Sequence, residues 1–319
     1  MASPSDATGR ITPFESSRST GTTAAGTPYT RINLKFGGQR CIALAPDRVR
    51  DRTDVTLVQH SHGYVDDETH IVSARMAATT EGMLDRGWVV TSHFMHGNNW
   101  GSKVAMNDLK DVYHWAAQRW HVKRVILHGF SMGGMATYNA LGQDVVPDIV
   151  AAITVNGVVD IAANWPDQAM AVYGGMNIDQ ALAYMAEPPG YDPLRDDPAK
   201  WAGKPIYMIG GTNDTVVPPA QHMEKFLTRA ATPEKIHYEV GTHGHLAGFM
   251  PEKCLPWADT YAPAYVAQDP YGVPAPNWPL LPPPPPPATE PPGSGVYWAD
   301  GREASLYRSD GTLVRLNRL

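Results

Sequence analysis

Short apolar runs alternate with longer amphipathic segments along most of the chain. Runs rich in Val, Ile and Leu, each bounded by turn-forming residues, are typical of buried strands. We predict strands at residues 30–36, 40–45, 55–58, 88–91, 125–127, 151–155, 206–209 and 236–240. The first two flank Gly37 and Gly38, which indicates an antiparallel hairpin.

The segments between the later strands have helical periodicity. Apolar side chains recur every three to four residues at Ala105, Leu109, Val112, Ala116 and Trp120, which places them on one face of a helix. Alternating strands and helices predict an α/β domain, with helices on both faces of an open, mostly parallel central sheet. The hairpin adds an antiparallel N-terminal edge.

Composition changes near both ends and suggests a division of the chain. Residues 1–28 are rich in Ser, Thr, Gly and Ala without apolar periodicity, and we expect a flexible N-terminal arm. The main α/β domain then covers residues 29–280, with a long insertion between strands at 161–204. Residues 281–293 contain a proline run that forms a polyproline II linker, and 294–319 form a small β-hairpin appendage.

The appendage carries two hairpin signals. Asp300-Gly301 and Asp310-Gly311 are both flanked by alternating apolar residues, which favours tight turns between strands. A segment of this size buries too little apolar surface for us to expect it to fold alone.

Composition excludes several classes of protein. Of 319 residues, 43% are hydrophobic and 18% charged, as in a globular protein. The charge of −6 comes from signs that are scattered rather than blocked, which argues against nucleic-acid binding. No apolar run approaches roughly 18 residues, and the first residues lack a signal-peptide pattern, so we expect no membrane span and a cytoplasmic or particle-associated protein. Cys41 and Cys254 are expected to be free and buried.

The clearest chemical motif is Gly129-Phe130-Ser131-Met132-Gly133-Gly134. It follows a predicted strand and precedes a helical segment, which is the context that a G-x-S-x-G nucleophile turn requires. Glycines are needed there because the turn is strained and its neighbours lie close. The other interpretation is a phosphate-binding turn, but the Walker lysine is absent. We therefore predict Ser131 as a nucleophile.

A serine nucleophile needs a base and an acid, and both have candidates downstream. Asp214 lies in the loop after residues 206–209, at the sheet edge where catalytic groups gather, although an aspartate there also suits a helix N-cap. His243 and His245 follow the strand at 236–240 and are both candidate bases. The order serine, aspartate, histidine is that of α/β-hydrolases. The resemblance to that class also makes Asp160, after the strand at 151–155, a minor alternative for the acid.

These motifs together resemble the α/β-hydrolase superfamily, over about residues 30–255. Within it they are most similar to the prolyl-oligopeptidase-like and esterase/depolymerase-like branches. In such relatives the catalytic histidine commonly ends a Tyr-Glu-x-x-x-His stretch before a glycine, which selects His243; a Gly-His-Leu pattern selects His245 instead. We prefer His243, with His245 lining the site. The insertion at 161–204 then corresponds to a helical cap.

An oxyanion intermediate needs two donors. The amide of Met132, directly after the nucleophile, supplies the first. The second is expected from the loop after residues 55–58, where His62-Gly63-Tyr64 resembles the His-Gly oxyanion loop of esterases. Gly63 and Tyr64 are equal candidates for the donor, and His62 is an accessory residue.

Histidines also permit a different hypothesis, a metal-dependent hydrolase. The candidates are His60, His62, His93, His96, His243 and His245. No aspartate follows the His-x-His pair at the short spacing such sites use, so we predict neither a metal nor any other cofactor.

The sequence therefore predicts a serine hydrolase that cleaves small or polymeric carboxylic esters through an acyl-enzyme. The alternatives are a serine peptidase of the prolyl-oligopeptidase type and a hydrolase domain carried on a structural protein. In the latter the tail, loosely similar to the β-rich ends of phage tail proteins, serves self-association or attachment.

Overall fold

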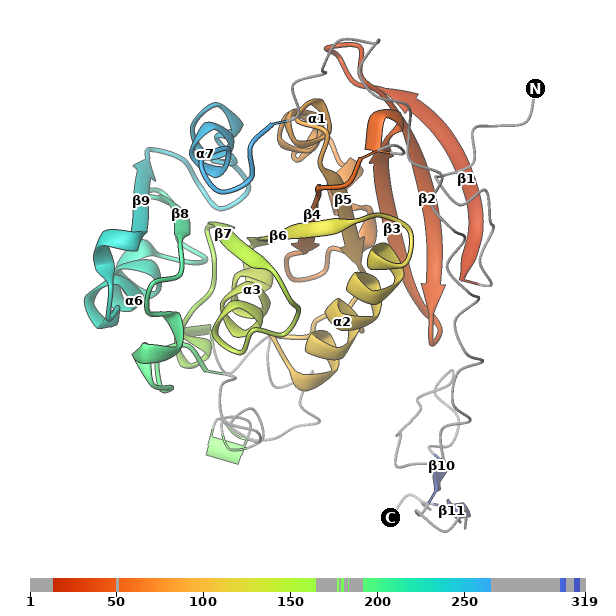
Figure 1. The fold of residues 1–319 in the computed structure, drawn as a ribbon. Helices are drawn as coiled ribbons and strands as arrows, with labels where there is room; N and C mark the ends of the chain where they lie inside the picture. The colour runs from red at the N-terminus through yellow and green to blue at the C-terminus, as the bar shows by residue number, and fades with distance from the viewer. Residues whose placement is uncertain are drawn as a thin grey trace, which may run out of the picture. The chain divides into compact units, whose positions relative to one another are not determined.

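Nine strands form one sheet in the order β1-β2-β3-β5-β4-β6-β7-β8-β9 (Figure 1). The strands are β1 (Glu15–Thr22), β2 (Pro28–Phe36), β3 (Gln39–Pro46), β4 (Val55–Ser61), β5 (Val89–His93), β6 (Val122–Phe130), β7 (Ile149–Val155), β8 (Ile206–Gly211) and β9 (Ile236–Gly241). The computed structural model describes residues 14–49, 52–164, 177, 179–180, 183, 192–264, 305–307 and 313–315. From β5 to β9 all neighbours are parallel, whereas β1, β2 and β3 pair antiparallel and β3 joins β5 antiparallel.

Each strand predicted from the apolar runs is present, and the α/β-hydrolase type of architecture is confirmed. β4 and β5 are buried along their whole length, as apolar strands covered on both faces must be. Several strands extend further toward their carboxyl ends than the apolar runs do. These ends carry polar or small residues, and the candidate site residues follow directly after them.

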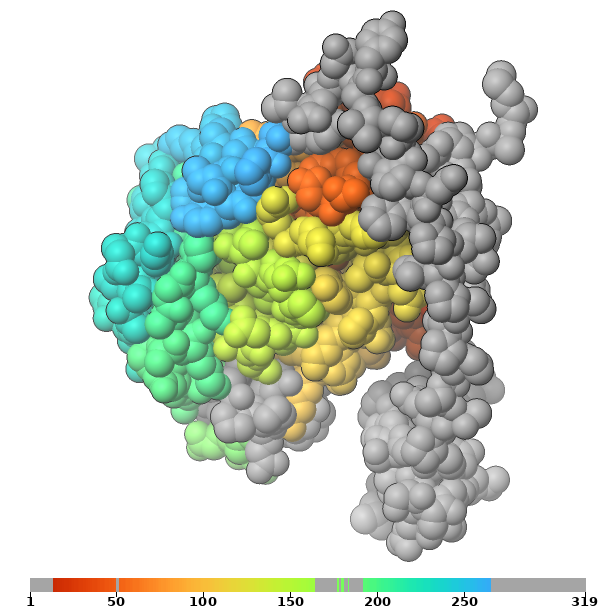
Figure 2. Space-filling view, in the orientation of Figure 1, coloured from red at the N-terminus to blue at the C-terminus, as the bar shows by residue number. Residues whose placement is uncertain are grey.

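Helices cover both faces of the sheet. They are α1 (Ala77–Asp85), α2 (Lys103–Ala117), α3 (Met132–Gly142), α6 (Met223–Arg229) and α7 (Pro251–Ala258). One core cluster joins α2, α3 and α6 to one face of the sheet, and a second joins α1 and α7 to the other. α2 and α3 contact each other; α3 is buried along almost its whole length, whereas Figure 2 shows the exposed face of α2, in yellow-orange.

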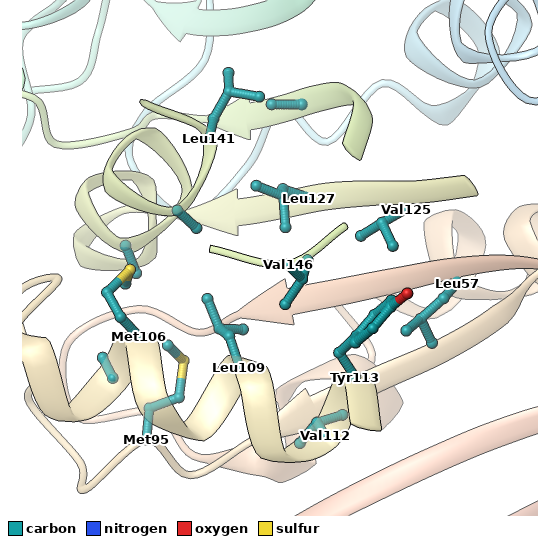
Figure 3. Close-up of a cluster of buried hydrophobic side chains, with 14 of the residues drawn as sticks. Leu57, Met95, Met106, Leu109, Val112, Tyr113, Val125, Leu127, Leu141 and Val146 are labelled. Carbon is teal, nitrogen blue, oxygen red and sulfur yellow. The ribbon is translucent and has the colours of Figure 1, made fainter. Parts of the chain in front are cut away.

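The larger core has the apolar stripe of α2 at its centre. Ala105, Leu109, Val112 and Ala116 are all buried, as their spacing predicts, and Trp120 is buried just beyond the helix end. Figure 3 shows Leu109 and Val112 directed with strand residues such as Leu57 and Leu127 into this cluster. The helix is therefore held against the sheet mainly by hydrophobic burial.

The prediction of a flexible arm at residues 1–28 is wrong for residues 15–22. Residues 15–22 form β1, which pairs antiparallel with β2. Its residues are nearly all polar and mostly exposed, since β1 is an edge strand, so no apolar alternation marks it. The carboxylate of Glu15 is buried and forms ion pairs with Arg18 and Arg119, which attaches the strand to the end of α2.

The insertion at residues 161–204 lies partly outside the described residues. Its described end packs on α3, because Trp201 is buried and its indole N–H donates to the carbonyl of Tyr138 at 2.9 Å. Trp201 thus belongs to the core. The cap-like role of the remaining insertion stays a prediction.

The chain divides into two compact units, Met1–Gly272 and Val273–Leu319. In the second unit, β10 (Ser305–Tyr307) and β11 (Leu313–Arg315) pair antiparallel on either side of Asp310-Gly311. The turn itself, the Asp300-Gly301 signal and the proline linker at 281–293 lie outside the described residues, and the predicted domain boundaries stay predictions.

Two further expectations concern cysteines and membranes. Cys41 and Cys254 are free and buried, as predicted. Burial raises the pKa of the Cys254 thiol to about 12, so it stays protonated at neutral pH. Among the helices that the structure describes, none has the length and apolar character to cross a bilayer.

Replacing Glu15 with Gln should destabilise the protein by about 3–5 kcal/mol, because it breaks a buried ion pair while leaving Arg119 buried. Urea unfolding followed by circular dichroism measures this change. Ser19→Ala, at an exposed position of the same strand, is the control and should change stability by less than about 0.5 kcal/mol. Equal stability of Glu15→Gln and the control would contradict the anchoring role of Glu15.

Candidate active site

Ser131 occupies a strained turn between β6 and α3. Its φ of 53° lies in the left-handed region that residues other than glycine rarely adopt. Backbone hydrogen bonds hold the turn: the Ser131 N–H donates to Val155 at 3.0 Å, and its carbonyl accepts from Val158 at 2.9 Å. The hydroxyl therefore projects from a fixed backbone at the carboxyl edge of the sheet.

The glycines of the motif are required by close backbone contacts. A Cβ on Gly133 would collide with the carbonyl of Ser61 at the end of β4. A Cβ on Gly134 would lie 2.5 Å from the Cα of Gly157, in the segment after β7. The start of α3 can thus lie between the ends of β4 and β7, the strands on either side of β6, only because these side chains are absent.

Ser131, His245 and Asp214 form a continuous hydrogen-bonded chain. The Ser131 Oγ lies 2.8 Å from Nε2 of His245, and Nδ1 of His245 lies 2.8 Å from Oδ2 of Asp214. A carboxylate only accepts, so Nδ1 carries the imidazole proton and Nε2 is free to accept the serine hydroxyl proton. Ser131 and Asp214 are 5% and 3% exposed, so these hydrogen bonds are largely shielded from water.

The loop after β8 presents Asp214 in its charged form. Its other oxygen, Oδ1, accepts from the amides of Val216 and Val217 at 2.9 and 2.8 Å. Burial alone would raise the pKa of the Asp214 carboxyl. The hydrogen bonds from His245 and from the two amides outweigh burial, so the pKa is lowered. Asp214 is not a helix N-cap, because the helical segments that follow it begin at Pro219 and Met223.

The preference for His243 over His245 does not agree with the geometry. The His243 ring is packed against three glycines, Gly211, Gly241 and Gly248, at positions where a Cβ would meet it. Its Nδ1 donates to the carbonyl of Gly244 at 3.2 Å. His243 thus fills the space between the ends of β8 and β9, and His245 takes the place between serine and aspartate. The Gly-His-Leu pattern was the signal that pointed to His245.

The predicted oxyanion residues lie beside the serine turn. Met132 is the first residue of α3, where an amide has no partner within the helix. Gly63 and Tyr64 follow β4, whose last residue pairs in register with Gly129 of β6. The close contact of Gly133 with the backbone after β4 also brings this loop against the turn.

His62 connects the predicted oxyanion loop to the loop after β5 rather than to the serine. Its Nδ1 lies 2.7 Å from the carbonyl oxygen of Gly63, and its Nε2 lies 2.9 Å from that of Phe94, in the loop after β5. The ring is fully buried. Tyr64 packs against buried Trp100, with ring centroids 6.0 Å apart. Both contacts restrict the position of the loop.

Asp160, the minor alternative for the acid, has other partners. Its Oδ2 pairs with Nζ of Lys225 at 2.9 Å, and its Oδ1 accepts from the amide of Ala162 at 3.1 Å. The aspartate that contacts a site histidine is therefore Asp214.

Two of the other histidines, His93 and His96, both lie near Asp108, with Nδ1 of His93 3.5 Å from Oδ2 of Asp108. His96 pairs with Asp108 at 2.9 Å, and His93 accepts from the amide of Met95 at 2.8 Å. Across the described residues, no group of three or more His, Cys, Asp or Glu is arranged to hold a metal ion.

Three buried histidines, on β4, on β6 and in the segment before α1, form a chain of contacts that the sequence did not predict. His60 contacts His128 through their Nδ1 atoms at 2.9 Å, and its Nε2 lies 2.8 Å from Nδ1 of His70. Each contact needs one protonated and one unprotonated nitrogen, which neutral rings provide. Burial lowers the pKa of His70 and of His128 to about 3, and lowers that of His60 well below its ordinary value. Sequence shows these residues only as isolated histidines on separate elements.

Comparisons with known proteins agree with the architecture. The family model of the prolyl oligopeptidase family matches residues 91–243, which include Ser131 and Asp214. No curated protein matches the chain significantly.

Many solved structures resemble it. An S-formylglutathione hydrolase from Agrobacterium tumefaciens has a TM-score of 0.59 at 12% identity, covering 76% of this chain and 98% of its own. TT1662 from Thermus thermophilus has a TM-score of 0.56 at 18% identity, covering 74% and 99%. A lipase/esterase from Lactobacillus plantarum has a TM-score of 0.53 at 19% identity, covering 73% and 98%.

The fold is therefore that of the α/β-hydrolases. The family match covers just under half of the chain, and it is consistent with a member of the α/β-hydrolase superfamily.

The histidine chain predicts a loss of stability in acid. Because the folded pKa values of His60, His70 and His128 lie below the unfolded value near 6.5, the unfolded state binds protons first as pH falls. Stability should decrease between about pH 6.5 and about pH 3, by up to about 1.4 kcal/mol per pH unit for each histidine. Urea unfolding at a series of pH values measures this slope.

The variant His128→Gln removes one such group and should reduce the slope by up to one proton. His114→Gln, at an exposed position on α2, is the matched control for the substitution itself. If His128→Gln keeps the full wild-type slope, the histidine chain is not the source of the acid sensitivity.

Proposed function

We propose that the chain hydrolyses carboxylic esters through an acyl-enzyme, with Ser131 as nucleophile, His245 as base and Asp214 as the residue that orients the base. The observation that carries this proposal is the pair of 2.8 Å hydrogen bonds that joins the three side chains. Their order along the chain, and the strained turn that carries the serine, both support it.

In the proposed reaction, Ser131 Oγ attacks the ester carbonyl while His245 Nε2 takes the hydroxyl proton. The charge on the resulting imidazolium is stabilised by the Asp214 carboxylate, whose lowered pKa keeps it ionised. The oxyanion of the tetrahedral intermediate accepts from the amide of Met132 and from that of Gly63 or Tyr64. His245 then gives its proton to the departing alcohol, and water releases the acyl group by the same steps in reverse.

The loops around the site favour a substrate with an apolar group. Val65 follows Tyr64 and is 77% exposed, and Leu246 follows His245 and is 61% exposed. Exposed apolar side chains next to reacting groups suit an aliphatic acyl or alcohol portion. The solved relatives also support an ester, since they include a lipase/esterase and an S-formylglutathione hydrolase that match over nearly their whole length.

A peptide is the second candidate substrate. The match to the prolyl oligopeptidase family favours it, because the matched residues carry both the serine and the aspartate of the proposed site. An amide requires the same nucleophile and base, but the departing amine depends more strongly on protonation by His245.

A fluorophosphonate probe should label Ser131, identified by peptide mass, and Ser131→Ala should lose the label. Replacing each of the two histidines with asparagine then separates their roles. His245→Asn should lower kcat for ester hydrolysis on the order of 10⁴-fold or more. His243→Asn retains a donor for the Gly244 carbonyl and should keep kcat within about tenfold, with lower stability from the cavity. Labelling at another residue, or a larger loss in the His243 variant, would overturn the proposed roles.

Matched ester and amide substrates with the same acyl group distinguish the two substrate classes. We expect kcat/KM for the ester to exceed that for the amide by several orders of magnitude, and Ser131→Ala to abolish both. Comparable rates, with the amide following a proline in a peptide, would favour the peptidase instead.

The proposed reaction uses no residue of the second unit. Residues 294–319 remain candidates for self-association or attachment, and the paired strands β10 and β11 support a small β-structured module there.

A further inference from the structure

The segment after β7 contacts the nucleophile on both sides. The carbonyl of Val155 accepts from the Ser131 N–H at 3.0 Å, and the N–H of Val158 donates to the Ser131 carbonyl at 2.9 Å. The Cα of Gly157, between them, lies against Gly134 of α3. Residues 155–158 thus define where the serine backbone lies.

The side chain of Asn156 extends the same segment to the loop of the base. Its Nδ2 donates to the carbonyl of His245 at 2.8 Å and to that of Ala247 at 3.0 Å, while the carbonyl of Gly244 lies at the limit of 3.5 Å. Asn156 is fully buried. The reverse orientation of the amide would direct its oxygen at carbonyl oxygens, so the contacts themselves establish which end is the donor.

The backbone of Asn156 is adapted to this place. Its φ of 47° lies in the left-handed region, where asparagine is among the most tolerated residues after glycine. Its N–H donates to the carbonyl of Ile209 in β8 at 2.8 Å. The residue is therefore bonded to the strand that leads to Asp214 and, through its side chain, to the loop that carries His245.

We propose that Asn156 is a positioning residue that sets the distance between His245 and Ser131. This inference rests on the proposed function. His245 lies beyond the end of β9 in a partly exposed loop, and loops of this kind move more than the strands they follow. Because one segment holds the serine backbone and also the His245 carbonyl, the two reacting groups share a common reference, and a displacement of about 1 Å would be costly.

Two substitutions test the amide without disturbing the backbone angle. Asn156→Gly retains the left-handed φ and removes both donors; Asn156→Asp retains the shape and replaces the donors with a carboxylate. We expect kcat for ester hydrolysis, and the rate of fluorophosphonate labelling at Ser131, to fall about 10²-fold in both at neutral pH, with little change in KM. Lowering the pH should raise the activity of Asn156→Asp relative to wild type, since a protonated carboxyl donates one hydrogen bond, whereas Asn156→Gly should not recover.

The matched control is Asp148→Gly, just before the other end of β7. Asp148 also has a positive φ, 60°, and it should behave as wild type. Rates are referred to folded protein, from circular dichroism and unfolding midpoints, so that lost stability is not counted as lost chemistry. If wild type labels at Ser131 and Asn156→Gly keeps its kcat and labelling rate, this inference alone is overturned; absence of labelling in folded wild type overturns both it and the proposed function. Parallel recovery of both Asn156 variants with pH would also contradict it.

Discussion

The left-handed turn at Ser131 depends on backbone groups that lie on either side of β6. A strained residue of this kind costs on the order of 1–3 kcal/mol and persists only where its surroundings over-determine it. Here the segment after β7 supplies hydrogen bonds to both peptide groups of Ser131, while the end of β4 lies so close that Gly133 can carry no side chain. The parallel order of these three neighbouring strands is therefore a condition for presenting the serine, and the two apolar cores maintain that order.

Burial disfavours the charged form of every ionisable group near the site, but the outcome differs between the aspartate and the histidines. At Asp214, three donors more than compensate for burial, and the carboxylate stays charged beside His245. At His60, His70 and His128 burial is the largest influence on the pKa, and the rings remain neutral and bonded to one another. An acid that is charged at neutral pH thus faces the histidine that takes part in the serine chain, while His60, His70 and His128 add no competing charge at that pH.

Much of the fold could be predicted from the sequence because its strands are apolar on both faces and its helices are amphipathic. Local chemistry also identified Ser131 and Asp214, since a nucleophile turn and a loop after a strand have recognisable surroundings. The choice between His243 and His245 could not be made in this way, because it depends on glycines distant in sequence that enclose the His243 ring. β1 was missed since an exposed edge strand needs only backbone pairing and one buried carboxylate. Asn156 gives no local signal, as its partners lie about ninety residues away.

The arrangement of the outer strands has a consequence for heat inactivation. Ser131 follows a central strand, but Asp214 and His245 follow β8 and β9, and β9 is the last strand of the sheet and only half buried. Such an edge opens at lower free energy than the centre of a sheet. Warming would therefore separate His245 from Ser131 while the core stays intact, and the proposed activity would be lost reversibly before the protein loses its structure.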